Sequence, residues 1–160
     1  MVTLYLTQTK LLEVPVLYLS SYFKKHQDRY YEVLESYHSE NGSPDEWLEF
    51  FLDGVTETAQ SAIETCRKIT EIRLEDMAKV HKLGKSAAES TLAMLQKLYS
   101  LPVVGLAEVM KWTGYSKQGA YNVIERLIEL DILVPRRKKD YGQKYEYKRY
   151  LDIFKEDGEV

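Results

Sequence analysis

Apolar residues recur every three or four positions along a long stretch of the chain that starts at Pro44 and ends near Leu83. This spacing predicts one face of an α-helix. The stretch has no proline after Pro44, and its next strong helix breaker is Gly84. We therefore expect one continuous helix, about 60 Å long at 1.5 Å per residue. The residues of the predicted apolar stripe are Trp47, Phe51, Val55, Ala59, Ala62, Cys66 and Ile69.

The start of this helix has a strong capping sequence. Ser43 can accept hydrogen bonds from the first backbone N–H groups, Pro44 suits the first helical position, and Glu46 can complete a capping box. The helix is longer than one small core can cover, so we expect its first half to belong to one packed unit and its far end to lead to another. Arg73 interrupts the stripe, which leaves the second half either solvent-exposed or facing a partner chain.

Shorter helices are predicted before the long one. Val2–Leu12 has helical spacing and is broken by Pro15, Val16–Phe23 leads into a short helix, and Asp28 can cap a further helix that ends near His38. A turn follows at 41–43. The residues expected on the inner side of the third helix are Tyr30, Val33, Leu34 and Tyr37.

Three helices are predicted after Gly84. The segment from Ser86 to Glu89 has the sequence of a second capping box and starts a helix with Leu92, Leu95 and Leu98 spaced by three. Leu106–Trp112 forms a short helix that ends at Thr113-Gly114, and Ser116 caps a helix that runs to about Leu130. Its inward residues are Ala120, Val123, Ile124, Leu127 and Leu130. Two helices joined by a tight glycine-containing turn have the form of a helix-turn-helix.

Two strands are expected to follow, at Ile132–Lys138 and Gln143–Lys148, with a turn at 140–142. A helix-turn-helix followed by a hairpin is a winged helix, and the segment Thr113–Leu133 resembles winged-helix transcription regulators. We expect Tyr150–Phe154 to dock as a last turn and Lys155–Val160 to be loose.

Such a module would place the start of its third helix in the major groove of DNA. Lys117, Gln118, Tyr121 and Asn122 are expected to face outward there, beside the cap Ser116. Gln118 and Asn122 have the fork geometry that reads adenine, whereas Lys117 suits guanine or phosphate. The cations expected along the DNA backbone are Arg136, Arg137, Lys138, Lys139 and Lys144. The alternative is a dimerisation or protein-docking module with a solvated hairpin.

The charge distribution supports a directed anionic partner. Residues 1–100 hold 11 basic and 15 acidic residues, a net charge of −4, whereas residues 101–160 hold 11 and 10, a net charge of +1. Seven basic residues against Asp140 and Glu146 give the segment Leu133–Arg149 a net charge of +5.

Cys66 is the only cysteine, which excludes an internal disulfide and fits the cytoplasm. No apolar run approaches the ~20 residues of a membrane span, and we expect no signal peptide.

The first half of the chain resembles the Fic family. The resemblance lies in Thr3–Leu6, Leu11-Leu12, Pro15–Ser20, Tyr30–Leu34 and Trp47–Val55. Fic proteins transfer AMP from ATP to protein hydroxyl groups and use the motif HPFxxGNGRxGR, whose histidine is the base and whose acidic residue holds Mg²⁺. The matching blocks are those that follow this motif, and the motif itself does not occur in the 160 residues.

No other catalytic centre can be assembled from the sequence. No glycine-rich turn precedes a helix, His26, His38 and His81 are scattered and are expected to be exposed, and Cys66 is expected to be a small core residue. Tyr30 and Tyr31 match a tyrosine pair that borders the adenine pocket of Fic proteins, but we favour the alternative that both simply pack helix on helix. We expect no cofactor of the chain's own; ATP and Mg²⁺ would be needed only with the missing catalytic part.

The sequence thus predicts a mainly α-helical protein. Residues 1–84 would form the C-terminal helices of a Fic-like domain with the long helix, residues 85–154 a winged helix-turn-helix with a small β-hairpin, and residues 155–160 a flexible tail. The first functional hypothesis is a non-catalytic module that binds DNA or regulates. The alternatives are the C-terminal half of a Fic adenylyltransferase, which would need a catalytic N-terminal fragment, and an assembly module. Apolar surface expected on Leu4, Leu6, Trp47 and Phe51 also predicts a homo-oligomer.

Overall fold

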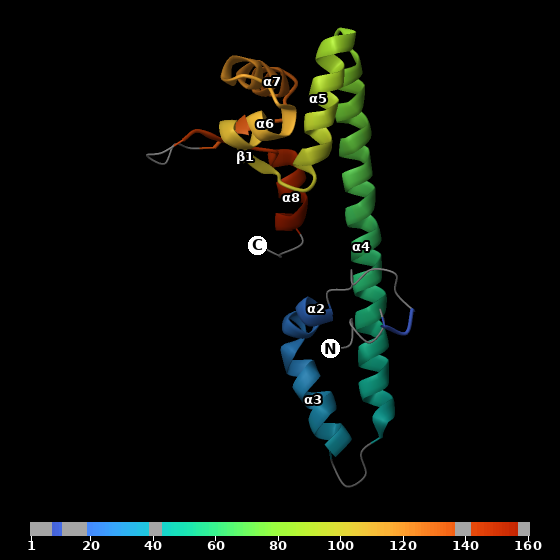
Figure 1. Cartoon of the computed structure of the whole chain (residues 1–160). Coiled ribbons are helices and arrows are strands. Elements are labelled where there is room, and N and C mark those ends of the chain that lie inside the picture. The colour runs from blue at the N-terminus through green and yellow to red at the C-terminus, as the bar shows by residue number, and fades with distance from the viewer. Residues whose placement is uncertain (1–7, 11–18, 39–42, 137–141, 157–160) are drawn as a thin grey trace. The chain divides into compact units, whose positions relative to one another are not determined.

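The computed structural model describes residues 8–10, 19–38, 43–136 and 142–156, and in these ranges it is mainly helical with a small three-stranded antiparallel sheet (Figure 1). The chain divides into two compact units, 1–66 and 67–160. Most of the predicted helix Val2–Leu12, including Leu4 and Leu6, lies outside the described residues, as do Asn41, Gly42 and 157–160. Among the described residues, no helix combines the length and the apolar composition that crossing a bilayer requires.

The first unit is built on aromatic packing between α2 (Leu19–Lys25), α3 (Gln27–His38) and the start of α4 (Pro44–His81). Tyr22, Val33 and Phe50 are its buried residues, and Phe23, Tyr30 and Trp47 pack around them. Rings of Phe23 and Tyr30 stack with centroids 5.3 Å apart, and Tyr22 and Phe50 are separated by the same distance. Gly54 makes this packing possible, since a Cβ atom there would lie 2.7 Å from the Tyr22 ring.

The long helix forms as predicted and Ser43 caps its start, but the side chain that partners Ser43 is Asp45 instead of the predicted Glu46. α4 has 38 residues, which corresponds to about 57 Å at 1.5 Å per residue. The hydroxyl of Ser43 accepts a hydrogen bond from the N–H of Asp45 at 3.1 Å and donates one to its carboxylate at 2.7 Å. Asp45 and Glu46 also place negative charge at the positive end of the helix dipole.

The face of α4 that this unit buries differs from the predicted stripe. Phe50 and Gly54 are buried beside Trp47, whereas Phe51 and Val55 are only half-buried. Cys66, predicted to be a core residue, is exposed, and so is Tyr37, predicted to lie inward. The periodicity alone could not choose between neighbouring faces, because Trp47, Phe50 and Phe51 fit either one.

The second unit consists of the last part of α4, α5 (Lys85–Leu98), α6 (Leu106–Thr113), α7 (Lys117–Glu129), α8 (Lys148–Glu156) and a sheet. α5 begins one residue before the predicted capping box, and its N-cap is Gly84, with no side-chain capping bond. The predicted box at Ser86 is therefore wrong: Ser86 lies in the first turn, where its carbonyl accepts a hydrogen bond from the Ser90 hydroxyl. The predicted last turn at Tyr150–Phe154 is part of α8, which extends through Glu156.

The sheet has the order β1-β3-β2, with β1 at Val103–Gly105, β2 at Val134–Pro135 and β3 at Lys144–Glu146. Both pairings are antiparallel, and Glu146 of β3 is opposite Val103 on one side and Val134 on the other. β2 and β3 lie inside the predicted strand segments, while β1 was not predicted. Of the predicted turn, Asp140 and Tyr141 lie outside the described residues, and Gly142 has a φ of +75°.

One apolar core joins these elements. Its buried residues include Val80 of α4, Leu95 and Leu98 of α5, Val109 of α6, and Tyr147, which follows β3. Ile72 and Met77 of α4 also pack against this core. The second unit accordingly begins inside α4, at Arg67, whereas the sequence predicted a boundary after the end of this helix, at Gly84. The last turns of α4 are thus part of the C-terminal unit.

Candidate nucleic-acid interface

The turn between α6 and α7 is fixed by backbone and side-chain hydrogen bonds. Gly114 has the left-handed backbone conformation (φ 69°), and its N–H donates to the carbonyl of Met110. The hydroxyl of Ser116 accepts a hydrogen bond from the N–H of Gly119 at 3.3 Å, which confirms the predicted cap. The N–H of Tyr115 donates to the hydroxyl of Thr113 at 3.3 Å. The start of α7 is therefore held at a defined angle to α6.

The two faces of α7 have different roles. Its buried face consists of Ala120, Val123, Ile124 and Leu127, as predicted. On the outer face, Lys117, Gln118 and Asn122 are exposed, whereas Tyr121 is half-buried. Nε2 of Gln118 donates to Oδ1 of Asn122 at 3.0 Å, so the two amides predicted to read bases lie side by side, one turn apart.

The start of α7 carries positive potential. Its first turn contains Lys117 and no acidic residue, and the helix dipole adds partial positive charge at the same end. The acidic residues of the helix, Glu125 and Glu129, come two and three turns later and are exposed. An anionic partner would therefore meet α7 most favourably at its N-terminal end.

Both of the predicted sheet cations that the structure describes, Arg136 and Lys144, have acidic neighbours. Nζ of Lys144 lies 3.0 Å from Oε1 of Glu108, whose other carboxylate oxygen accepts the N–H of Gly105 at 2.8 Å. These interactions hold the pKa of the Glu108 carboxyl below its ordinary value. Arg136 is exposed, with Nε 3.7 Å from Glu146. The remaining predicted contacts, Arg137, Lys138 and Lys139, lie outside the described residues.

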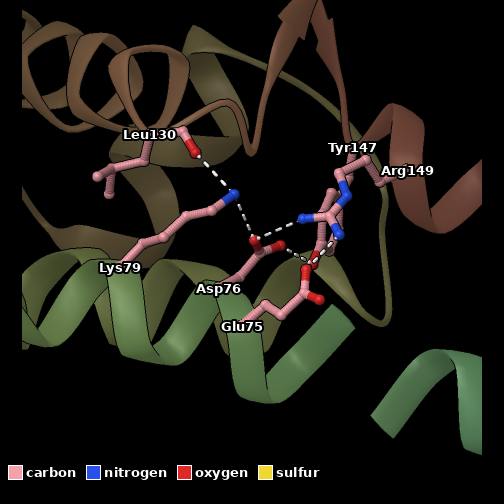
Figure 2. Close-up of polar contacts among 6 residues, drawn as sticks. All are labelled: Glu75, Asp76, Lys79, Leu130, Tyr147 and Arg149. Carbon is pink, nitrogen blue, oxygen red and sulfur yellow. Dashed lines mark hydrogen bonds and ion pairs between the residues drawn. The ribbon is translucent and has the colours of Figure 1, made fainter. Parts of the chain in front are cut away.

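Arg149, counted in the basic segment, belongs instead to a partly buried ionic network (Figure 2). Its guanidinium group donates to Asp76 at 3.1 Å and to Glu75 at 2.5 Å, both on α4. Lys79 donates to Asp76 at 2.9 Å and to the carbonyl of Leu130 at 3.1 Å. The positive charge of Arg149 is thus directed toward α4, which corrects the expectation that it adds to the basic patch.

Asp76 is the centre of this network and was missed by the sequence reasoning. Its side chain is fully buried, and the hydroxyl of Tyr147 donates to it at 2.5 Å. Burial raises the pKa of Tyr147, and the hydrogen bond to Asp76 raises it further. One signal was present in the sequence: Asp76 lies four residues from Ile72 and from Val80, on the apolar side of α4, where an unpaired carboxylate would be costly.

A hollow of about 370 Å³ lies beside the turn, between α5 and α6. Trp112 and Tyr115 line it together with Glu89 and Lys97 of α5. The two side chains of opposite charge leave this surface without a net charge, so it does not extend the positive surface at the start of α7.

The tyrosine pair suggested for nucleotide binding is divided between two environments. Tyr30 is half-buried and packs against Phe23 and Trp47, whereas Tyr31 is 57% exposed. His38 and His81 are exposed as predicted, but His26 is half-buried against the ring of Tyr22. Within the described ranges, no group of three or more His, Cys, Asp or Glu residues could hold a metal ion.

Comparison with known proteins adds no family to this description. No protein-family model matches the chain, and no curated protein sequence matches it.

Proposed function

We propose that the C-terminal unit is a winged-helix module that binds duplex DNA, with α7 as its recognition helix. The order α5-β1-α6-α7-β2-β3 and the sheet order β1-β3-β2 support this proposal, since a helix-turn-helix is followed by a hairpin whose second strand pairs with both other strands. The three-residue connection Gly114–Ser116 has the length typical of a helix-turn-helix.

The observation that carries the proposal is the outer face of the first turns of α7. Gln118 and Asn122 are exposed, adjacent and already hydrogen-bonded to one another, and either amide can form two hydrogen bonds with the N6 and N7 atoms of adenine. Binding a base would exchange their mutual hydrogen bond for bonds to DNA. Lys117 and the positive helix end would meet phosphate oxygens beside them.

The sheet would supply part of the non-specific affinity. Arg136 is exposed on the strand β2 side of the hairpin, and the neighbouring Arg137, Lys138 and Lys139 continue the basic sequence. Lys144 would contribute less than the sequence suggested, because its ammonium group already forms an ion pair with Glu108. Affinity should fall steeply with salt, since each phosphate contact releases condensed counterions.

Fluorescence anisotropy with mixed-sequence duplex DNA at about 50 mM and about 200 mM salt tests this proposal. We expect Lys117→Ala to weaken binding to all sequences and to reduce the salt slope by about 1. Neutralising Arg136–Lys139 should weaken binding further. The double substitution Gln118→Ala and Asn122→Ala should instead reduce discrimination between sequences, by about 1–3 kcal/mol per base pair read.

Matched controls come from α5. Lys85→Ala and Gln96→Ala remove the same chemical groups from exposed positions on that helix and should leave binding unchanged. Absence of binding at the lower salt concentration, or equal losses in the α5 and α7 variants, would contradict a DNA-binding role for α7.

For residues 1–84 we infer the C-terminal part of a Fic-like domain, which would act as an adenylyltransferase only with ATP, Mg²⁺ and a fragment that carries the catalytic motif. The sequence blocks support this inference, and the exposed ring of Tyr31 is available to stack on a base. Mixing the chain with such a fragment and measuring transfer of labelled AMP tests it. Calorimetry measures whether the chain binds ATP without the catalytic fragment. If Tyr31 stacks on the adenine, mixing should release or absorb heat, and Tyr31→Ala should remove this signal.

A further inference from the structure

Small and apolar residues follow a seven-residue repeat along the first part of α4. We name Leu52, Val55, Ala59, Ala62 and Cys66 the seam; their spacing alternates between three and four residues, and Leu48 extends it by one step. An average period of 3.5 residues, rather than 3.6, is the pattern that keeps one line of a helix against a second, supercoiled helix.

Charge is absent from both borders of the seam. The flanking residues between Phe51 and Cys66 are Phe51, Thr56, Thr58, Ile63 and Thr65. In the same interval the charged residues are Asp53, Glu57 and Glu64, and at 100° per residue all three lie on the opposite face of the helix. The helix thus has one uncharged face that extends over more than four turns.

The helices of the same unit pack on the other side of α4. Their contacts are with Trp47 and Phe50, Gly54 makes room for Tyr22, and Lys25 forms an ion pair with Glu57 at 2.7 Å. On the uncharged face, Leu48, Leu52 and Ile63 are each 53% exposed, and Cys66 is exposed as well. Within the part of the chain that the structure describes, the seam is therefore partly accessible: Leu52 and Cys66 are exposed, whereas Val55, Ala59 and Ala62 are half-buried.

We propose that the seam is the interface between two copies of this chain, which pair helix to helix along α4. The seven-residue repeat selects a helix as the partner, and the small side chains of Ala59 and Ala62 allow two helix axes to approach closely. The charge pattern suits a second copy: charged borders normally choose a partner of complementary sign, and borders without charge can pair with an identical surface. Two copies of this seam meet without repulsion, because their acidic residues point away. This inference is independent of DNA binding.

Sedimentation-velocity measurements on the full chain over a range of micromolar concentrations test the proposal. The wild-type chain should sediment as a dimer at the upper concentrations, and the double variant Ala59→Glu, Ala62→Glu as a monomer. The matched control Gln60→Glu, Ser61→Glu adds the same two charges between these alanines, in the same turn but on the face away from the seam, and should remain dimeric. Circular dichroism establishes that each variant keeps its helix content.

The thiol of Cys66 gives an independent readout, since it is the only cysteine and lies on the seam. Its rate of reaction with a thiol reagent should fall severalfold as the concentration rises through the dimer transition, and this fall should be lost in the Ala59→Glu, Ala62→Glu variant. A wild-type monomer with a protected thiol would show that the chain's own residues cover the seam. A monomer with a reactive thiol would indicate a different partner protein. Either result, or a dimer that survives the seam substitutions, overturns the proposal.

Discussion

The hydroxyl of Tyr147 donates a hydrogen bond to the carboxylate of Asp76 across 2.5 Å, and both side chains are fully buried. Tyr147 follows β3, while Asp76 lies on α4, 71 positions earlier in the chain. The backbone N–H of Tyr147 also donates to the carbonyl of Pro102, just before β1. One residue therefore connects the sheet to the end of the long helix, and Lys79 and Arg149 balance the charge of the carboxylate that it contacts.

Replacing Asp76 should be among the most destabilising single changes in the C-terminal unit. Asp76→Ala leaves the buried hydroxyl of Tyr147 without its acceptor and removes the carboxylate that Lys79 and Arg149 share, and losing charged hydrogen bonds of this kind costs about 1.5–3 kcal/mol each. Urea unfolding followed by circular dichroism measures the loss. Asp152→Ala is the matched control, because its pair with Lys155 is exposed and should contribute less than about 1 kcal/mol. Equal effects of the two substitutions would contradict a central role for Asp76.

The phenol of Tyr147 should account for only part of that loss. Tyr147→Phe keeps the ring and its packing but removes one donor from Asp76, which should cost about 1–3 kcal/mol. The double variant with Asp76→Ala should be less destabilised than the sum of the two single changes, because both remove the same hydrogen bond. Strict additivity in the same urea experiment would indicate that the two residues do not interact.

The C-terminal unit should lose stability in alkaline solution. Burial is the main cause that raises the pKa of four tyrosines, which are Tyr99, Tyr145, Tyr147 and Tyr150. A raised pKa means that the folded state holds its proton longer than the unfolded state. The stabilisation is complete below the ordinary tyrosine pKa of about 10 and is lost as the pH rises above it.

Ultraviolet absorbance of tyrosinate, recorded together with circular dichroism, checks this expectation. Some of the 13 tyrosines should ionise only as the helical signal falls, whereas all should ionise near the ordinary pKa in guanidinium. Tyr147→Phe should reduce the late-ionising fraction. Complete ionisation of the folded chain near pH 10 would exclude the predicted protection.

Local sequence signals predicted the elements around the α6–α7 turn well. A glycine that ends one helix and a serine that caps the next act through hydrogen bonds to residues within four positions, so Gly114 and Ser116 could be assigned without knowledge of the fold. The same holds for the continuous helix after Pro44. These features depend only on near neighbours in the chain.

Features that depend on distant residues could not be predicted in the same way. β1 has three residues, and what makes Val103–Gly105 a strand is its pairing with β3, some 40 positions later. The direction of Arg149 depends on Glu75 and Asp76, which precede it by more than 70 positions. Likewise, the inner face of α4 was decided by the fit of Tyr22 over Gly54, a contact that periodicity does not encode.

Glu108 should stabilise the start of α6 and its junction with the sheet. Its carboxylate accepts the N–H of Gly105 and the ammonium group of Lys144, so Glu108→Ala should cost about 1 kcal/mol, as for other capping residues. Lys144 and the backbone N–H groups lower the pKa of Glu108. The stabilisation is therefore present above the ordinary glutamate pKa and is lost as the pH falls through the lowered value.

Hydrogen exchange at the N–H of Gly105 measures this effect locally. Exchange should be faster in Glu108→Ala than in the wild-type chain, after correction for the intrinsic pH dependence. Glu129→Ala, an exposed acidic residue of α7, should leave the rate unchanged. If both variants behave alike, the carboxylate of Glu108 does not protect this amide.

Gly54 should be a position where alanine weakens a helix instead of strengthening it. Inside a helix, alanine is normally favoured over glycine by about 1 kcal/mol. A Cβ atom at Gly54, however, would lie 2.7 and 2.8 Å from two ring atoms of Tyr22, which is buried and packed against Phe50. The ring would have to move, so we expect Gly54→Ala to destabilise the first unit by about 1–3 kcal/mol in urea unfolding. Ser61→Ala is the control: this residue is exposed on the same helix, so alanine should stabilise the helix by about 0.5 kcal/mol. A stabilising Gly54→Ala would show that the Tyr22 ring is not held against α4.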